Sequence, residues 1–132
     1  MSKEIFTNIY DTEKFSFVIG VTEGYFHDNE NANIDFIYLV DQVANEVEQQ
    51  TGIYIAFNII PSTTVYKKEW GCPEGGEKTY NLSAIRNPQF NKDAVQWIVA
   101  CNLIVDKLQL ILTQSTITSE ITRIIMRYGC LK

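Results

Sequence analysis

The stretch that decides the fold is KDAVQWIVACNLIVDKLQLILT, residues 92–113. Its apolar side chains recur at helical spacing and fall on one broad face, formed by Ala94, Trp97, Ile98, Cys101, Ile104, Val105, Leu108, Ile111 and Leu112. This face predicts a helix that covers a sheet. We expect Asn91 to cap the helix and Phe90 to pack on Val95 as a hydrophobic staple.

The opposite side of this helix is itself partly apolar, because Val99, Leu103 and Leu110 lie there among polar residues. An apolar patch on a small domain usually marks a partner, and another copy of the same chain is the commonest one. We therefore expect a homo-oligomer built partly on this helix.

Strands are predicted where apolar and polar residues alternate. The clearest run spans residues 15–21, and a shorter strand over 5–10 would pair with it as a hairpin through residues 11–13. Further strands are expected over 53–61, 78–86 and 116–128, with an extended ribbon over 62–68. The last segment also fits a helical stripe, but seven of its thirteen residues are β-branched, which favours a strand.

A second amphipathic helix is predicted from Ile34 to about Gln50, capped by Asn33 and ended by Thr51 and Gly52. The elements follow the order β-β-α-β-β-β-α-β. This order indicates an α+β fold, in which one antiparallel β-sheet carries two α-helices packed on one face. The length of 132 residues suits a single domain, residues 1–132.

The net charge of −5 argues against a binder of polymeric nucleic acid and against a membrane-surface protein. The charge is unevenly distributed, because residues 1–66 hold ten acids against two bases, whereas residues 67–132 hold nine bases against six acids. All three arginines lie in the second half. An anionic ligand would therefore bind there, although mutual attraction between the two halves explains the asymmetry equally well.

Metal, cofactor and disulfide chemistry find little support in the sequence. Three widely spaced cysteines exclude a complete disulfide framework, and no Cys-x-x-Cys motif is present. The single histidine, His27, falls in a polar loop whose acids lack the glycine and glutamate of a calcium site. Residues 69–77 are glycine-rich but lack the Gly-Lys-Ser/Thr of a P-loop, so they are expected to connect two strands. We expect no metal, no cofactor and a cytoplasmic protein.

Binding is the function class that the residues favour, because a nucleophile, a base and an orienting acid are not easily assembled with one histidine. The second half offers groups for a nucleotide. They are Phe90 for stacking, Asn91 and Asn102 for hydrogen bonds, and Arg86, Arg123 and Arg127 for phosphate charge. Each also has a plainer interpretation as a staple, a cap or a solvated residue. The sequence thus predicts a binding protein without catalytic residues.

A family resemblance makes this expectation more specific. The stretch Tyr66-x-x-Glu69-Trp70-Gly71-Cys72-Pro73-x-Gly75-Gly76-Glu77, then Asn87-Pro88-x-Phe90, the Trp97-bearing helix and Gln114-Ser115-Thr116 resemble the first described family of phage Thoeris anti-defence proteins. The resemblance covers residues 66–117. It implies a non-enzymatic oligomer in the infected host cell that sequesters a cyclic ADP-ribose signal made by a bacterial TIR-domain enzyme.

The resemblance also implies roles for single residues. Adenine would stack between the ring of Phe90 and the guanidinium of Arg123, with Asn102 nearby. The alternative hypothesis is a protein-binding inhibitor or structural phage protein, whose acidic N-terminal half docks on a basic partner.

Overall fold

A computed structural model describes residues 3–21 and 32–132 of the chain. Its elements are β1 (Ile5–Gly20), α1 (Ala32–Thr51), β2 (Asn58–Thr64), the short 3-10 helix η1 (Lys68–Trp70), β3 (Glu77–Ile85), α2 (Ala94–Ile111) and β4 (Ser119–Leu131). The loop that contains His27 and the rejected calcium motif lies outside the described residues.

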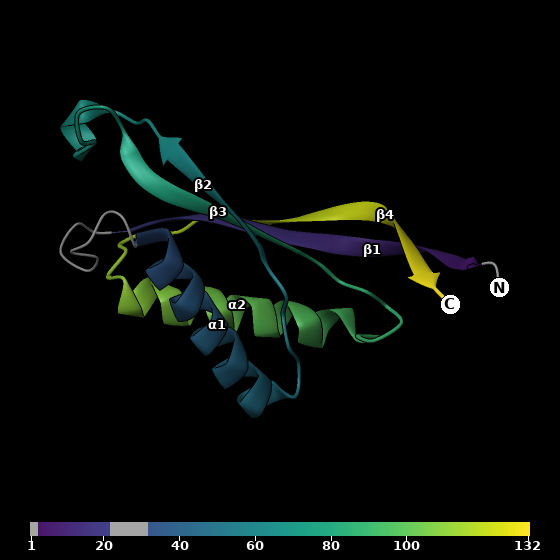
Figure 1. The fold of residues 1–132 in the computed structure, drawn as a ribbon. Coiled ribbons are helices and arrows are strands. Elements are labelled where there is room, and N and C mark those ends of the chain that lie inside the picture. The colour runs from purple at the N-terminus through teal and green to yellow at the C-terminus, as the bar shows by residue number, and fades with distance from the viewer. Residues whose placement is uncertain (1–2, 22–31) are drawn as a thin grey trace.

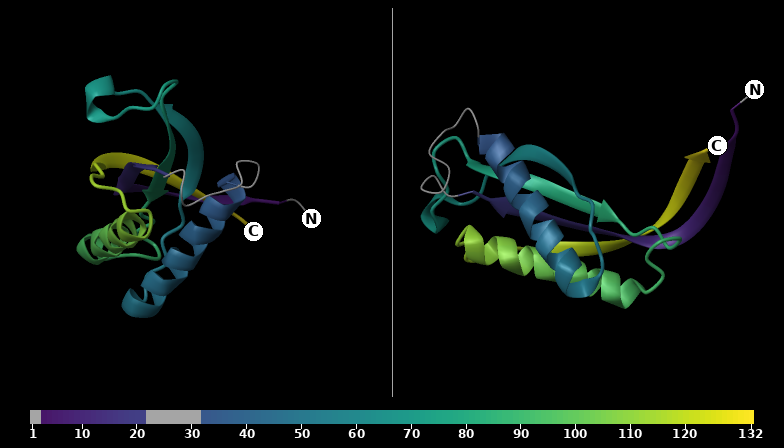
Figure 2. Two further views of the ribbon diagram at one scale, coloured as in Figure 1. Left: turned by 90° about the vertical axis from the view of Figure 1, so that its left-hand side faces the viewer. Right: turned by 60° about the horizontal axis from the view of Figure 1, so that its bottom comes forward.

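The four strands form one antiparallel sheet in the order β2-β3-β1-β4. Both helices pack on the same face of this sheet, below it in Figure 1. The predicted α+β class, an antiparallel sheet with two helices on one face, is confirmed. The paired strands β1 and β4 continue beyond the helices as an arm that carries both termini (Figure 2).

The predicted hairpin within the first 20 residues is wrong, because β1 is a single strand of 16 residues. Its residues 5–17 pair with β4, where Asp11 lies opposite Ile125, and its residues 14–20 pair with β3, where Gly20 lies opposite Thr79. The Thr12 hydroxyl donates to the carbonyl oxygen of Arg86 at 2.7 Å, and Thr12 is buried. Pairing with distant strands thus overrides the turn preference of residues 11–13.

The core lies between the sheet and the helices. The predicted inward face of β1 is confirmed, since Phe15, Phe17 and Ile19 are buried. The ring of Phe36 from α1 stacks on Tyr80 of β3, with centroids 4.1 Å apart and ring planes 5° apart. The predicted helices and the strand β3 are present with shifted ends, and the C-terminal segment is the expected strand.

Two details of the helix starts differ from the predictions. Asn33 lies inside α1, so it is not the cap of that helix. Asp93, not Asn91, caps α2, because its side chain accepts from the backbone N–H of Gln96 at 3.1 Å. The packing of Phe90 on Val95 stays a prediction, and both residues are about two-thirds exposed.

The strand predicted over residues 53–61 begins only at Asn58. Ile55 is fully buried, and Ile53 and Phe57 pack against the core. The alternation that predicted a strand therefore reflects burial of every second side chain along an extended connection without a paired neighbour. The expected ribbon beyond Pro61 is the second half of β2, which ends at Thr64.

The helix α2 is long and apolar enough to cross a membrane by length and composition alone. Packing accounts for this hydropathy, because Trp97, Ala100, Cys101, Ile104, Val105 and Leu108 are buried. On the outward side Val99 and Leu110 are exposed, as predicted, whereas Leu103, also expected there, is partly buried and packs against the core. An oligomer through this face stays a prediction.

Candidate functional site

A trough of about 610 Å³ lies on the face of the sheet opposite the core, because its lining residues on β1 and β3 alternate with the buried ones. Its volume falls within the range of small-molecule sites. Every second residue of β1 and β3 contributes to it, because the residues between them point into the core. The lining includes Ser16, Val18 and Gly20 of β1, Thr79, Asn81 and Ser83 of β3, Glu77, and Gln114, Thr116 and Glu120 from the segment after α2.

Glu77 and Tyr66 form a hydrogen-bonded pair at one end of the trough. The Tyr66 hydroxyl donates to Oε1 of Glu77 at 2.8 Å. The register explains the contact: Thr64 pairs with Glu77, and Tyr66 follows Thr64 by two residues, so it returns to the same side. The hydrogen bond to Glu77, then desolvation and the nearby charges raise the pKa of Tyr66. The phenol therefore stays protonated and keeps Glu77 in place.

Gly20 is where the backbone makes room for this carboxylate. A Cβ atom at Gly20 would overlap Oε2 of Glu77 and lie 2.9 Å from Oε1 of Gln114. Any larger residue would therefore displace both side chains. The glycine needs no unusual backbone angle here, so its function is to permit a close approach.

Hydroxyl groups fix the strands around the pair. The buried Thr79 hydroxyl lies 2.8 Å from the Ser62 hydroxyl and 2.9 Å from that of Thr64, which ties β2 to β3 beside Glu77. Farther along the trough the Ser16 hydroxyl donates to Oε1 of Glu120 at 3.1 Å. The trough thus holds a carboxylate at each end.

Arg86, expected to bind phosphate, forms an ion pair with the partly buried carboxylate of Glu13. Its Nη2 atom lies 2.8 Å from Oε2 of Glu13, and its Nη1 atom donates to the backbone carbonyl of Asn91 at 2.8 Å. Only 8% of the Arg86 side chain is exposed. The contacts account for Arg86 and for the backbone of Asn91 as structural groups.

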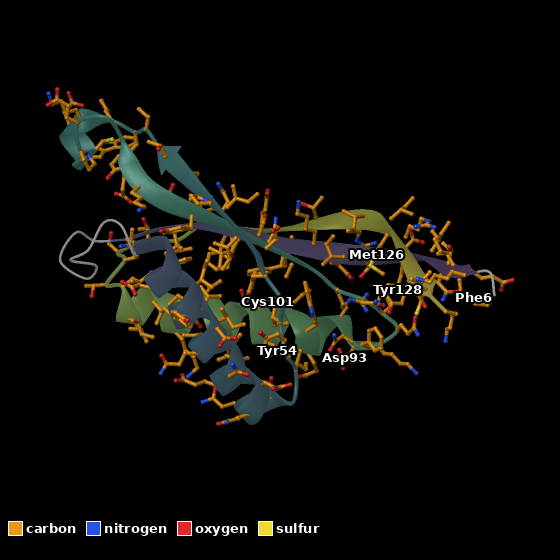
Figure 3. The ribbon with its side chains drawn as sticks, in the orientation of Figure 1. Phe6, Tyr54, Asp93, Cys101, Met126 and Tyr128 are labelled. Carbon is orange, nitrogen blue, oxygen red and sulfur yellow. The ribbon has the colours of Figure 1, made fainter. Side chains whose placement is uncertain are left out.

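The other predicted ligand residues lie along β4 and α2. Arg123 is the cross-strand partner of Glu13, and Arg127 donates from Nη2 to the Thr7 hydroxyl at 3.1 Å. The ring of Phe90 meets Tyr128 edge-on, with centroids 6.0 Å apart, near the arm in Figure 3. Asn102 is exposed on α2. The structure brings Arg86, Asn91 and Arg123 together around Glu13, and places all six predicted residues outside the trough. Ligand binding by the six stays a prediction.

Four residues in or beside the trough are not among the predicted site residues: Gly20, Tyr66, Glu77 and Gln114. Two signals were present: a glycine interrupts the clearest apolar strand, and Tyr66 and Glu77 bound the quoted glycine-rich motif. Neither signal says that the two ends of that motif meet, because the contact depends on the register of β2 against β3.

Comparison with known proteins finds a matching family model and solved structures with a similar fold. The family model described as SAM lyase matches residues 10–130. No curated protein sequence matches. A phage SAM lyase in complex with S-methyl-5'-thioadenosine superposes with a TM-score of 0.54 over 90% of this chain and 88% of that chain, at 12% identity. The apo state of a phage SAM lyase gives a TM-score of 0.53, 91% and 89% coverage and 12% identity. At this identity the two structures show the fold alone.

The family match corrects four expectations. A non-enzymatic sponge is wrong, because the matching family is one of lyases, and the expected absence of catalysis falls with it. Cyclic ADP-ribose as the partner is wrong for the same reason. The Thoeris resemblance over residues 66–117 is replaced by a match that spans more of the chain. Since residues 10–130 fit its model, the chain belongs to the SAM lyase family.

Proposed function

We propose that this chain cleaves S-adenosylmethionine (SAM) in the trough beside Glu77 and releases S-methyl-5'-thioadenosine. The observation that carries the proposal is the Tyr66–Glu77 hydrogen bond of 2.8 Å, which fixes a carboxylate at the end of a cavity of small-molecule size. Support comes from the family and from the phage SAM lyase whose structure contains S-methyl-5'-thioadenosine.

The reaction balances without water or an added acid. A carboxylate oxygen of the substrate's own amino-acid end attacks its γ-carbon, the bond from that carbon to sulfur breaks, and the electron pair goes to sulfur. The products are the neutral thioether S-methyl-5'-thioadenosine and a five-membered lactone that keeps its ammonium group. Because a neutral thioether leaves, no residue has to donate a proton to it.

Glu77 contributes by placing the substrate. Its negative charge attracts the ammonium group of the amino-acid end, which persists from substrate to product. Holding that group restricts the amino-acid chain to conformers in which the carboxylate can reach the γ-carbon. Orientation of this kind accounts for large rate accelerations when reacting atoms are brought close together.

The proposed activity also suggests a biological role in an infected cell. An enzyme that removes SAM would starve SAM-dependent methyltransferases in an infected cell, which is one form of phage anti-defence. This retains the coarse part of the expected role and replaces sequestration by degradation.

The test is a product assay on the purified protein. Incubation with SAM should produce S-methyl-5'-thioadenosine and homoserine lactone in equal amounts, measured by liquid chromatography and mass spectrometry. In ¹⁸O-water, homoserine formed by later opening of the lactone should carry the label in its carboxyl group. Label in its hydroxyl group would instead show attack by water on the γ-carbon and would contradict a lyase.

Variants connect the activity to the trough. Glu77→Gln should lower kcat/KM about 100-fold or more, because it removes the charge that orients the substrate. Glu74→Gln is the matched control, since Glu74 is exposed in the same connection and lies outside the trough lining. Unchanged SAM after incubation with wild-type protein, or full activity of Glu77→Gln, would overturn the proposal.

A further inference from the structure

We propose that Gln114 is a specificity-determining residue that holds, together with Glu77, the ammonium group of the substrate's amino-acid end. This inference rests on the proposed lyase function and extends it to a second residue. Gln114 comes from the segment after α2, so it reaches the trough from a different part of the chain than Tyr66 and Glu77.

The first observation is that two acceptor oxygens converge over Gly20. A Cβ atom there would meet Oε2 of Glu77 and Oε1 of Gln114, so these oxygens are close neighbours above the same backbone atom. Both also line the trough with Gly20. A carboxylate oxygen and an amide oxygen that face one small space attract a cationic donor.

The second observation is how each side chain is turned. Nε2 of Gln114 donates to the carbonyl of Leu112 at 3.3 Å, which leaves Oε1 as the atom over Gly20. Oε1 of Glu77 accepts from Tyr66, which leaves Oε2 there. A substrate ammonium has three N–H donors and no acceptor, so it suits these two oxygens. The substrate's sulfonium has no N–H to donate, so it suits them less well.

The third observation is the strained turn that presents Gln114. Thr113 has a φ of 52°, in the left-handed region where a β-branched residue is rare. The N–H of Gln114 bonds back to Gln109 at 3.0 Å, and the Gln109 side chain donates to the carbonyl of Ser115 at 3.4 Å. Strain held in place by surrounding hydrogen bonds is typical of functional positions.

The arrangement separates substrate from product. S-Methyl-5'-thioadenosine lacks the amino-acid end, so it makes no contact with the two oxygens and gains nothing from Gln114. S-Adenosylhomocysteine keeps the ammonium but has a neutral sulfur, so it reports this contact apart from any contact with the sulfonium.

The experiment measures binding of these two neutral-sulfur ligands by isothermal titration calorimetry. Gln114→Met keeps the size of the side chain and removes the acceptor. It should weaken the binding of S-adenosylhomocysteine about 10- to 100-fold, the loss expected for a hydrogen bond to a charged group. The affinity for S-methyl-5'-thioadenosine should change by no more than about twofold. Gln109→Met is the matched control, because it loosens the same turn and lies outside the trough lining; it should not change the ratio of the two affinities.

The outcomes separate the two proposals. Equal weakening of both ligands by Gln114→Met would show a merely structural role, and unchanged binding of both would show no contact; either overturns the inference. If Gln114→Met weakens only S-adenosylhomocysteine binding but the wild-type protein leaves SAM intact, the proposed function alone is contradicted. If the enzyme cleaves SAM but Gln114→Met leaves the ratio of the affinities for S-adenosylhomocysteine and S-methyl-5'-thioadenosine unchanged, this inference alone is contradicted.

Discussion

The Tyr66 phenol donates to Oε1 of Glu77 across 2.8 Å at the end of the trough. The hydrogen bond and the negative charge of Glu77 favour the neutral phenol, so they raise the pKa of Tyr66. The tyrosine therefore remains a donor throughout the neutral pH range. This makes it a positioning residue, because it acts on the substrate through the carboxylate it holds.

Tyr66 should ionise above the ordinary tyrosine pKa, and Glu77→Gln should bring its pKa down. In the window between the ordinary and the raised pKa, the folded state keeps a proton that the unfolded state has lost, so this contribution to stability disappears as the pH rises through it. The measurement is the tyrosinate absorbance of wild type minus Tyr66→Phe during an alkaline titration. The same difference taken in the Glu77→Gln background is the control. An identical midpoint in both backgrounds would show that the hydrogen bond is absent in solution.

Gly20→Ala should remove most SAM cleavage while the protein still folds. The added methyl group would overlap Oε2 of Glu77 and crowd Gln114, so the carboxylate must move. Displacement by about 1 Å can cost about 100-fold in rate. Gly129→Ala is the matched control, because Gly129 pairs with Thr7 outside the trough lining and a Cβ there would meet the flexible end of Arg127 at 3.1 Å. Kinetic assays on both variants, with circular dichroism to check folding, test this prediction. Equal activity of the two variants would show that the approach of Glu77 to Gly20 is not needed for cleavage.

Arg86→Met should destabilise the protein by about 3–5 kcal/mol, because it leaves the partly buried carboxylate of Glu13 without its partner. Arg127→Met, at an exposed arginine with one hydrogen bond to Thr7, should change the free energy of unfolding by about 0.5 kcal/mol or less. Urea denaturation followed by fluorescence measures both. A small loss for Arg86→Met would show that its ion pair with Glu13 contributes little to stability in solution.

The sequence predicted the layers of the fold because burial leaves a periodic signal. The inward faces of β1 and α2 could be identified from spacing alone, and most of their predicted residues are buried, although Ile111 at the end of α2 is exposed. The signal failed where burial and pairing differ: residues 53–57 alternate without being a strand, and residues 11–13 favour a turn yet lie inside β1. Pairing partners lie far apart in the chain, so local preference does not specify them.

The site was harder to predict than the fold because its geometry comes from register. The arginines were predicted to bind phosphate because of their charge, and the structure pairs the charge of Arg86 with that of Glu13. The sequence does not distinguish Glu77 from the other acidic residues, because Tyr66 comes beside it only through the pairing of Thr64 with Glu77. Gly20 carried a signal as a break in an apolar strand, and only the approach of Glu77 and Gln114 gives that break a meaning.

Cys101 should be the one thiol of three that resists alkylation in the folded protein. It is fully buried in α2, and desolvation raises its pKa to about 12, so almost none of it is thiolate at neutral pH. Cys72 and Cys130 are partly exposed and free. Mass spectrometry after iodoacetamide treatment should show two modified cysteines in native protein and three in denaturant. Cys101→Ala should show two under both conditions, and rapid modification of Cys101 in native wild type would contradict the packing of α2 on the sheet.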